Sequence, residues 1–81
     1  MSSISEIEAK EKEAKRKKEI RQEMERTIEE AKWNMYAEKW ELAEKQLQGA
    51  RDKAVFLRDK DKIDEILGLF VNCKNEQKVE L

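Results

Sequence analysis

The chain has 81 residues, of which 38% are hydrophobic and 46% charged, with no proline and only two glycines. This length allows one domain at most, and the composition is typical of long helices and coiled coils. Its 18 basic and 19 acidic residues give a formal net charge of −1, which excludes a global field that attracts nucleic acid or anionic membranes. No stretch alternates apolar and polar residues as a strand does, so we predict an all-α fold.

Residues 1–19 are the first predicted element, a helix that carries charge on every side. Glutamate precedes lysine by four residues in pairs such as Glu8–Lys12 and Glu13–Lys17, and each such pair stabilises a helix by about 0.2–0.5 kcal/mol. No continuous apolar stripe accompanies these charges. We therefore expect a solvent-exposed helical extension without core contacts.

A helix over about 20–37 comes next, because an apolar stripe with helical spacing begins there. Its members are Ile20, Met24, Ile28, Ala31 and Met35. Trp33 and Tyr36 lie on another face of the same helix, since each residue turns the helix by about 100°.

Two further helices are predicted, over about 40–57 and 61–73. The apolar stripe of the first is Trp40, Ala43, Leu47, Ala50, Ala54 and Leu57, and that of the second is Ile63, Ile66, Leu67, Phe70 and Val71. The polar segment 58–61 separates them, and Asp59 or Asp61 is expected to cap the third helix. We interpret Gly49 as a point of close helix approach. Together these elements predict a three-helix domain over 20–75, followed by a frayed tail over 76–81.

The connection between the first two stripes leaves two architectures open. In one, the chain folds back near Ala37–Lys39 and forms a helical hairpin, against which the third helix packs. In the other, a single helix runs through this segment and dimerises along an a/d heptad seam made of Trp33, Tyr36, Trp40, Ala43, Leu47, Ala50, Ala54 and Leu57. The hairpin is favoured, because the seam leaves Ile28, Ala31 and Met35 exposed.

The segment from Ala31 to Cys73 resembles a tetratricopeptide-type helical pair. The resemblance rests on the aromatic–small–large–small spacing of Trp40, Ala43, Leu47 and Ala50. The same segment is about equally similar to microtubule-interacting-and-trafficking domains, which are three-helix modules. Both resemblances imply recognition of a peptide or helix rather than catalysis.

Catalytic candidates are few. The chain has no histidine, which removes the commonest general base and the commonest zinc ligand. Cys73 has no base near it in the sequence, and we interpret it as a small apolar residue at a helix end. Asp61, Asp64 and Glu65 are interpreted as complementing the dipole at a helix start. We expect no enzyme activity, cofactor or metal.

Protein binding is the leading functional hypothesis, because tryptophan and tyrosine are enriched at interface hot spots. We predict an adaptor or small inhibitor that binds a partner's helix or peptide through Trp33, Tyr36 and Met24. The alternative is a structural protein that self-associates as a coiled coil, with a homodimer as its simplest form. A distant third is nucleic-acid binding through a basic cluster of Lys15, Arg16, Lys17, Lys18 and Arg21, which neighbouring glutamates weaken.

Location is predicted from what the chain lacks. The first residues, 1–4, have no apolar stretch of the signal-peptide kind, and no segment approaches the length of a membrane span. The single Cys73 cannot form an intramolecular disulfide. These features predict a cytoplasmic protein, or a nuclear one if the basic cluster serves as an import signal.

Overall fold

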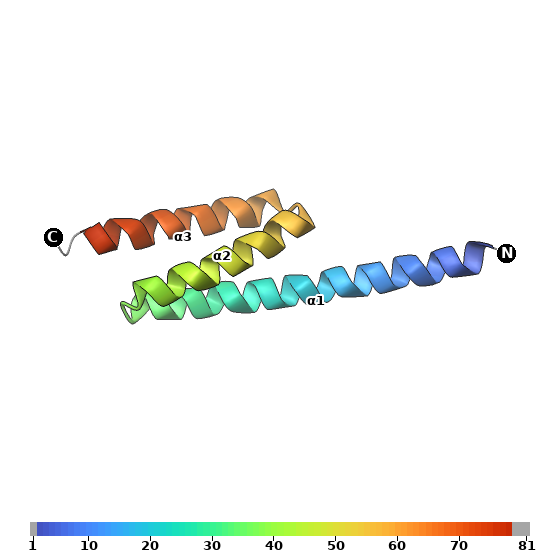
Figure 1. Cartoon of the computed structure of the whole chain (residues 1–81), viewed down its shortest axis with the longest axis horizontal. Helices are drawn as coiled ribbons and strands as arrows, with labels where there is room; N and C mark the ends of the chain where they lie inside the picture. Colours follow the sequence, from blue (N-terminus) through green and yellow to red (C-terminus); the bar gives the residue numbers. More distant parts are fainter. Residues whose placement is uncertain (1, 79–81) are drawn as a thin grey trace.

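The computed structural model describes the backbone of residues 2–78 and the side chains of residues 7–77. It contains three helices, α1 (Ser2–Tyr36), α2 (Trp40–Leu57) and α3 (Lys60–Lys78). Figure 1 shows α2 returning along the second half of α1, and α3 returning along α2, so that consecutive helices are antiparallel. The predicted all-α hairpin with a long first helix is confirmed, and a continuous helix through residues 37–39 is wrong.

Both turns end the preceding helix in the same way, with one residue in the left-handed conformation. Glu38 has φ 64° and Arg58 has φ 55°. At the first turn the Glu38 N–H donates to Met35 O at 3.0 Å, and the Lys39 N–H donates to Asn34 O at 2.8 Å. These two bonds are those of the Schellman motif, and Arg58 with Asp59 repeats them on Val55 and Ala54. The motif satisfies helix-end carbonyls that are otherwise unpaired.

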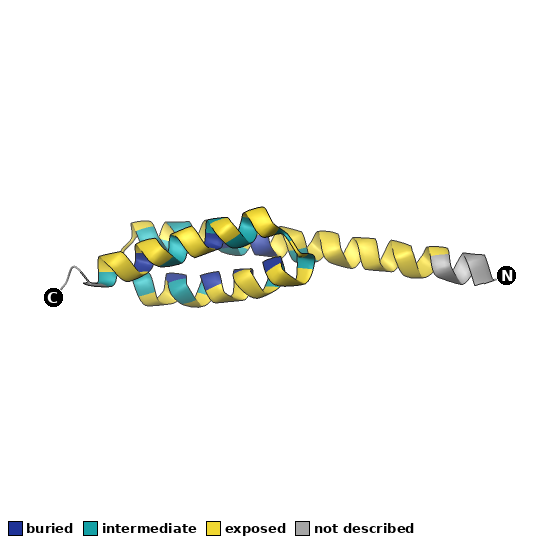
Figure 2. Ribbon diagram, turned by 90° about the horizontal axis from the view of Figure 1, so that it is seen from above, coloured by how far each residue is buried: buried dark blue, intermediate teal, exposed yellow. Residues whose placement is uncertain are grey.

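The core lies between the three helices and is thin. Its buried residues are Met24, Ile28, Ala31, Ala43, Leu47, Ala50, Ala54, Ile66 and Cys73, seen as the dark blue inner faces in Figure 2. Four of these nine are alanines, and such small side chains let helix axes approach closely. The predicted stripes of α1 and α2 therefore do form the core. They also use up Ala43 and Leu47, so the proposed heptad seam is not free to dimerise.

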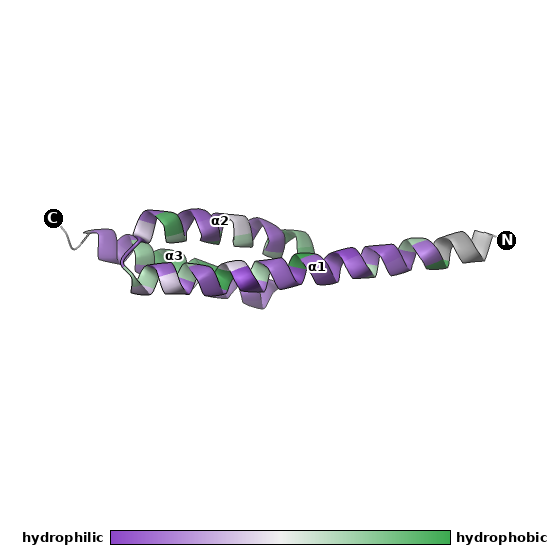
Figure 3. Ribbon diagram, turned by 90° about the horizontal axis from the view of Figure 1, so that it is seen from below, coloured by the Kyte–Doolittle hydropathy of each residue, from purple (hydrophilic) through white to green (hydrophobic). Residues whose placement is uncertain are grey.

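The first half of α1 projects beyond the packed helices. Residues 7–19 are all exposed, and Figure 3 shows this half of the helix as mostly hydrophilic. Its 35 residues make α1 about 52 Å long, whereas α2 has 18 residues. Among the side chains of α1 that the structure describes, Ile20 is the first that is not fully exposed.

Ion pairs tie α1 to the other two helices. Arg21 Nη1 lies 2.6 Å from Asp59 Oδ2, and the other Asp59 oxygen accepts the backbone N–H of Lys62 at 3.2 Å. Asp59 therefore caps α3, as predicted, and also holds the α2–α3 turn against α1. The hydrogen bond from Arg21, with that from the Lys62 backbone, lowers the pKa of Asp59 below its usual value.

A second bridge joins α1 to α3 through Glu65. Lys32 Nζ lies 3.4 Å from Glu65 Oε1, and Lys62 Nζ lies 3.2 Å from Glu65 Oε2. Burial alone would raise the pKa of Glu65, but the hydrogen bonds from Lys62 and Lys32 outweigh it and lower the pKa. Glu65 was interpreted only as a dipole-complementing residue, and the structure gives it this additional contact.

Two sequence-based expectations differ from the structure. The third helix does not end at residue 73 but continues to Lys78, because no glycine or proline follows and Gln77 Nε2 donates to Glu44 Oε1 at 2.8 Å. Gly49 is not a point of close approach, since a Cβ built there meets nothing within 4 Å. It lies on the exposed side of α2, where its hydrogen simply faces solvent. Residues 79–81 of the expected frayed tail lie outside the described residues.

Candidate interaction surfaces

Trp33 and Tyr36 form an exposed aromatic pair near the end of α1, which we call the aromatic surface. Trp33 is 70% exposed and Tyr36 is 85% exposed. Their ring centroids are 6.5 Å apart and the ring planes meet at 80°, an edge-to-face arrangement that is worth about 0.5–1.5 kcal/mol beyond area burial. The two rings thus support each other while both remain open to a partner.

The aromatic surface lies off the core stripe of α1, and Trp33 is on the side of the helix nearly opposite that stripe. Lys32, which reaches Glu65 of α3, precedes Tyr36 by one helical turn and shares its face. Asn34 points the other way, and its Nδ2 donates to Gln46 Oε1 of α2 at 2.7 Å. The stripe that packs into the core occupies the arc between these directions, so the helix cannot bury the aromatic pair by a small rotation.

Met24, the third residue of the predicted partner surface, is in the core. Its side chain is fully buried, because it belongs to the same stripe as Ile28 and Ala31. A partner cannot contact Met24 in this structure, and its assignment to the partner surface is wrong.

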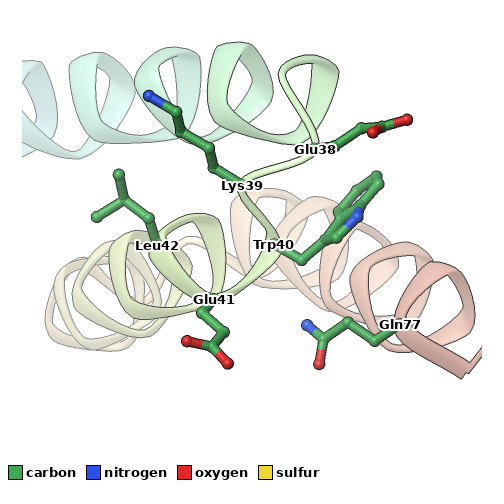
Figure 4. A pocket seen from close by; sticks show the side chains of 6 residues that line it. All are labelled: Glu38, Lys39, Trp40, Glu41, Leu42 and Gln77. Carbon is green, nitrogen blue, oxygen red and sulfur yellow. The ribbon is translucent and has the colours of Figure 1, made fainter. Parts of the chain in front are cut away.

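Trp40 differs from Trp33 in its surroundings. It is half-buried and packs against the core, at the point where α2 begins. Figure 4 shows its indole beside the turn, in an open depression that Glu38 and Gln77 also line. The remaining lining residues are Lys39, Glu41 and Leu42. The position of Trp40 at the junction of all three helices indicates a structural role.

The predicted basic cluster lies on the projecting half of α1. All five of its residues are exposed, namely Lys15, Arg16, Lys17, Lys18 and Arg21. Two of them are engaged within the protein, however. Lys17 Nζ pairs with Glu13 at 3.3 Å, and Arg21 holds Asp59. Arg21 therefore serves the fold, and the charge available to a phosphate is correspondingly smaller.

A second apolar surface lies between α2 and α3, on the side away from α1, and we call it the α2–α3 groove. It is lined by Glu44, Gln48, Arg51, Leu67, Phe70, Val71 and Lys74. Leu67 is 42% exposed and Val71 is 56% exposed, although both were expected in the buried stripe of the third helix. The five residues of the predicted stripe within 63–71 cover a wider arc of α3 than one neighbouring helix can bury. That width is the signal by which the sequence could have indicated the groove.

Residues that could bind a metal ion or act as a nucleophile do not form a cluster in the described part of the chain. Among residues 7–77, no group of three or more His, Cys, Asp or Glu side chains is placed to hold a metal ion. Cys73 is buried, and burial, together with the nearby charge of Glu44, raises the pKa of its thiol. A raised pKa disfavours the nucleophilic thiolate. Within the described residues, no helix has an apolar stretch long enough to cross a membrane.

Comparisons with known proteins provide no relative for this arrangement. No protein-family model, no curated protein and no solved structure matches the chain.

Proposed function

We propose that the protein is a non-enzymatic interaction module, an adaptor or small inhibitor, that binds a helix or peptide of a partner protein. The observation that carries the proposal is the aromatic surface, in which the most exposed large apolar side chains of the described residues stand next to each other. Large aromatic side chains left in water lose the free energy that burial would give them. The fold does not need them there, since its core is complete without them.

The aromatic surface has the physical character of a binding hot spot. Trp33 and Tyr36 offer large contact areas with few rotatable bonds, so little conformational entropy is lost when a partner covers them. They stand on a continuous helix that α2 fixes from behind, so the surface is preorganised. Charged neighbours such as Glu29 and Lys32 pair with each other at 3.6 Å and supply a polar rim of the kind that surrounds hot spots.

Resemblance to tetratricopeptide-type helical pairs supports the same proposal. The resemblance implies recognition of an extended peptide or helix. A partner segment with one or two large apolar anchors, laid beside α1, would bury the exposed faces of both rings. Removing a hot-spot side chain of this type costs about 2 kcal/mol or more of binding free energy, which is about a 30-fold loss of affinity.

The experiment compares a variant that loses the aromatic surface with a control variant that loses an exposed apolar side chain on another helix. The tagged protein, its Trp33→Ala/Tyr36→Ala variant and a Leu42→Ala control are used to capture partners from the source cells. Leu42 is also an exposed apolar residue but lies on α2. A captured protein is then purified, and its affinity is measured by calorimetry against all three chains.

The expected result is a partner whose affinity falls at least about 30-fold in the aromatic double variant and stays unchanged in the control. Circular dichroism must show the same helix content in all three chains. A partner that binds the double variant as tightly as the unmodified protein would refute the aromatic surface as the binding site.

A further inference from the structure

The α2–α3 groove is a second unpartnered surface, separate from the aromatic surface. Leu67, Phe70 and Val71 supply its apolar floor, and Val55 extends it along α2. The groove is lined by residues of α2 and α3 alone, whereas the aromatic surface is carried by α1. An occupant of the groove would therefore leave Trp33 and Tyr36 free.

The wall of the groove on α2 carries opposite charges at its two ends. Glu44, Gln48 and Arg51 follow each other at spacings of four and three residues, so they form one row along the helix. Glu44 and Arg51 are seven residues apart, which places them two turns and about 10 Å from each other along the axis. When a second such row is turned end to end, its Arg51 lies where the first row has Glu44, and its Glu44 lies where the first row has Arg51. The two rows then place opposite charges against each other at both ends.

We propose that a second copy of this chain occupies the groove, related by a two-fold axis perpendicular to α2 that passes beside Gln48. Each α2 then lies antiparallel to α2 of the second copy, and Glu44 faces Arg51 of the second copy at both ends. A closed two-fold interface makes every such contact twice. Complementary charges at an interface select the partner and fix its register.

The α3 side of the groove accommodates the same axis. Phe70 and Val71 lie at the middle of the lining residues of α3, with Leu67 and Lys74 at the two ends. The two-fold axis puts Phe70 against Val71 of the second copy, and Leu67 against the aliphatic stem of Lys74 of the second copy. The apolar residues meet at the centre, and the charged ammonium groups remain at the rim, where water reaches them.

The size of the face sets the strength of the dimer. The 18 residues of α2 give a face about 27 Å long, and two adjacent helices are about 20 Å wide, so roughly 500 Å² of each copy is covered. Stable complexes cover about 800 Å² of each partner. The dimer is therefore a weak one, with a dissociation constant in the micromolar range or above.

The test is sedimentation velocity across a concentration series from about 1 µM to about 1 mM, the range in which such a dimer forms. The unmodified protein should change from monomer to dimer. Val71→Glu should remain monomeric throughout, and Leu42→Glu, on another face of α2, should dimerise like the unmodified protein. Circular dichroism checks that each variant is folded, which is expected because Leu42 and Val71 are both exposed.

Charge reversal tests the register. Glu44→Arg and Arg51→Glu should each weaken the dimer at least tenfold, and the double variant Glu44→Arg/Arg51→Glu should restore it. A protein that is monomeric at every concentration would overturn the proposal and leave the groove to a different protein. A dimer that survives Val71→Glu, or that Trp33→Ala/Tyr36→Ala dissociates, would place the interface elsewhere. Failure of the double reversal to restore the dimer would overturn the antiparallel register.

Discussion

Leu47→Ala is expected to remove most of the stability of the domain. Leu47 is the only fully buried large side chain of α2, and α2 is the helix that packs against both of the others. Truncating such a leucine costs about 2–5 kcal/mol, the lost transfer free energy plus the cavity. A core of this size supplies only about 3–5 kcal/mol in total. Because 1 kcal/mol shifts the melting temperature of a domain of this length by about 4–8 °C, Tm should fall by at least about 10 °C.

Leu42→Ala is the matched control, because it makes the same chemical change on the same helix. Leu42 is 47% exposed, so about half of its transfer free energy is involved and no closed cavity forms. We expect a loss of about 1 kcal/mol or less. Thermal and urea unfolding, followed by circular dichroism at low micromolar protein, compare the two variants. Equal losses of stability would refute the placement of the core on the Ala43–Leu47–Ala50–Ala54 face.

Three further predictions follow from the same contacts. Removing residues 1–19 should leave the free energy of unfolding unchanged to within about 1 kcal/mol, because side chains 7–19 are exposed. A loss above about 2 kcal/mol, which is the scale of one buried large side chain, would show that the extension packs against the domain. In Trp40→Phe the remaining Trp33 emission should be quenched strongly by acrylamide, and in Trp33→Phe the emission of half-buried Trp40 should be quenched weakly; the reverse ranking would exchange their roles. The folded pKa of Asp59 is lowered, so its stabilisation is present above its unfolded pKa of about 3.9 and is lost as the pH falls through the folded value. The urea midpoint should therefore fall less between neutral and acidic pH in Asp59→Asn than in the unmodified protein, and an equal fall in both would contradict the role given to Asp59.

Much of the fold is predictable from the spacing of apolar residues. The structure buries one face of α1 and one face of α2 that the spacing marked as apolar. These faces are Met24, Ile28 and Ala31 on α1, and Ala43, Leu47, Ala50 and Ala54 on α2. These positions were predictable because the stripe of each helix has an arc that a neighbouring helix can cover. The exposed extension was predictable for the opposite reason, since residues 7–19 offer no stripe to cover.

The turn at residues 37–39 is much less visible in the sequence. Helices that end in a Schellman motif usually place glycine at the left-handed position, but here Glu38 takes it. The left-handed conformation costs a non-glycine residue about 1–2 kcal/mol, so the turn is imposed by the packing of α1 on α2 rather than by local preference. Arg58 at the second turn has the same conformation, but there the neighbouring polar residues marked the break.

The candidate sites were predicted only in part. The position of Trp33 and Tyr36 off the core stripe followed from helical periodicity, whereas Met24 was wrongly given to the same surface although it belongs to the stripe. The α2–α3 groove was not predicted, because whether Leu67 and Val71 are buried depends on how many helices surround α3. That number is a property of the tertiary structure, and a single apolar stripe does not encode it.

The fold-back at residues 37–39 is the central claim, since the core between α1 and α2 forms, and the aromatic surface stays outside a heptad seam, only if α2 returns along α1. Lys53 Nζ lies 3.5 Å from Glu23 Oε2, so spin labels at these two positions, in a Cys73→Ala background diluted with unlabelled protein, report the fold-back directly. One continuous helix would separate the two positions by about 45 Å, at 1.5 Å for each residue. Pulsed electron–electron double resonance should give a single distance between the two spin labels below about half of that value. A distribution of distances centred at about 45 Å would contradict the hairpin.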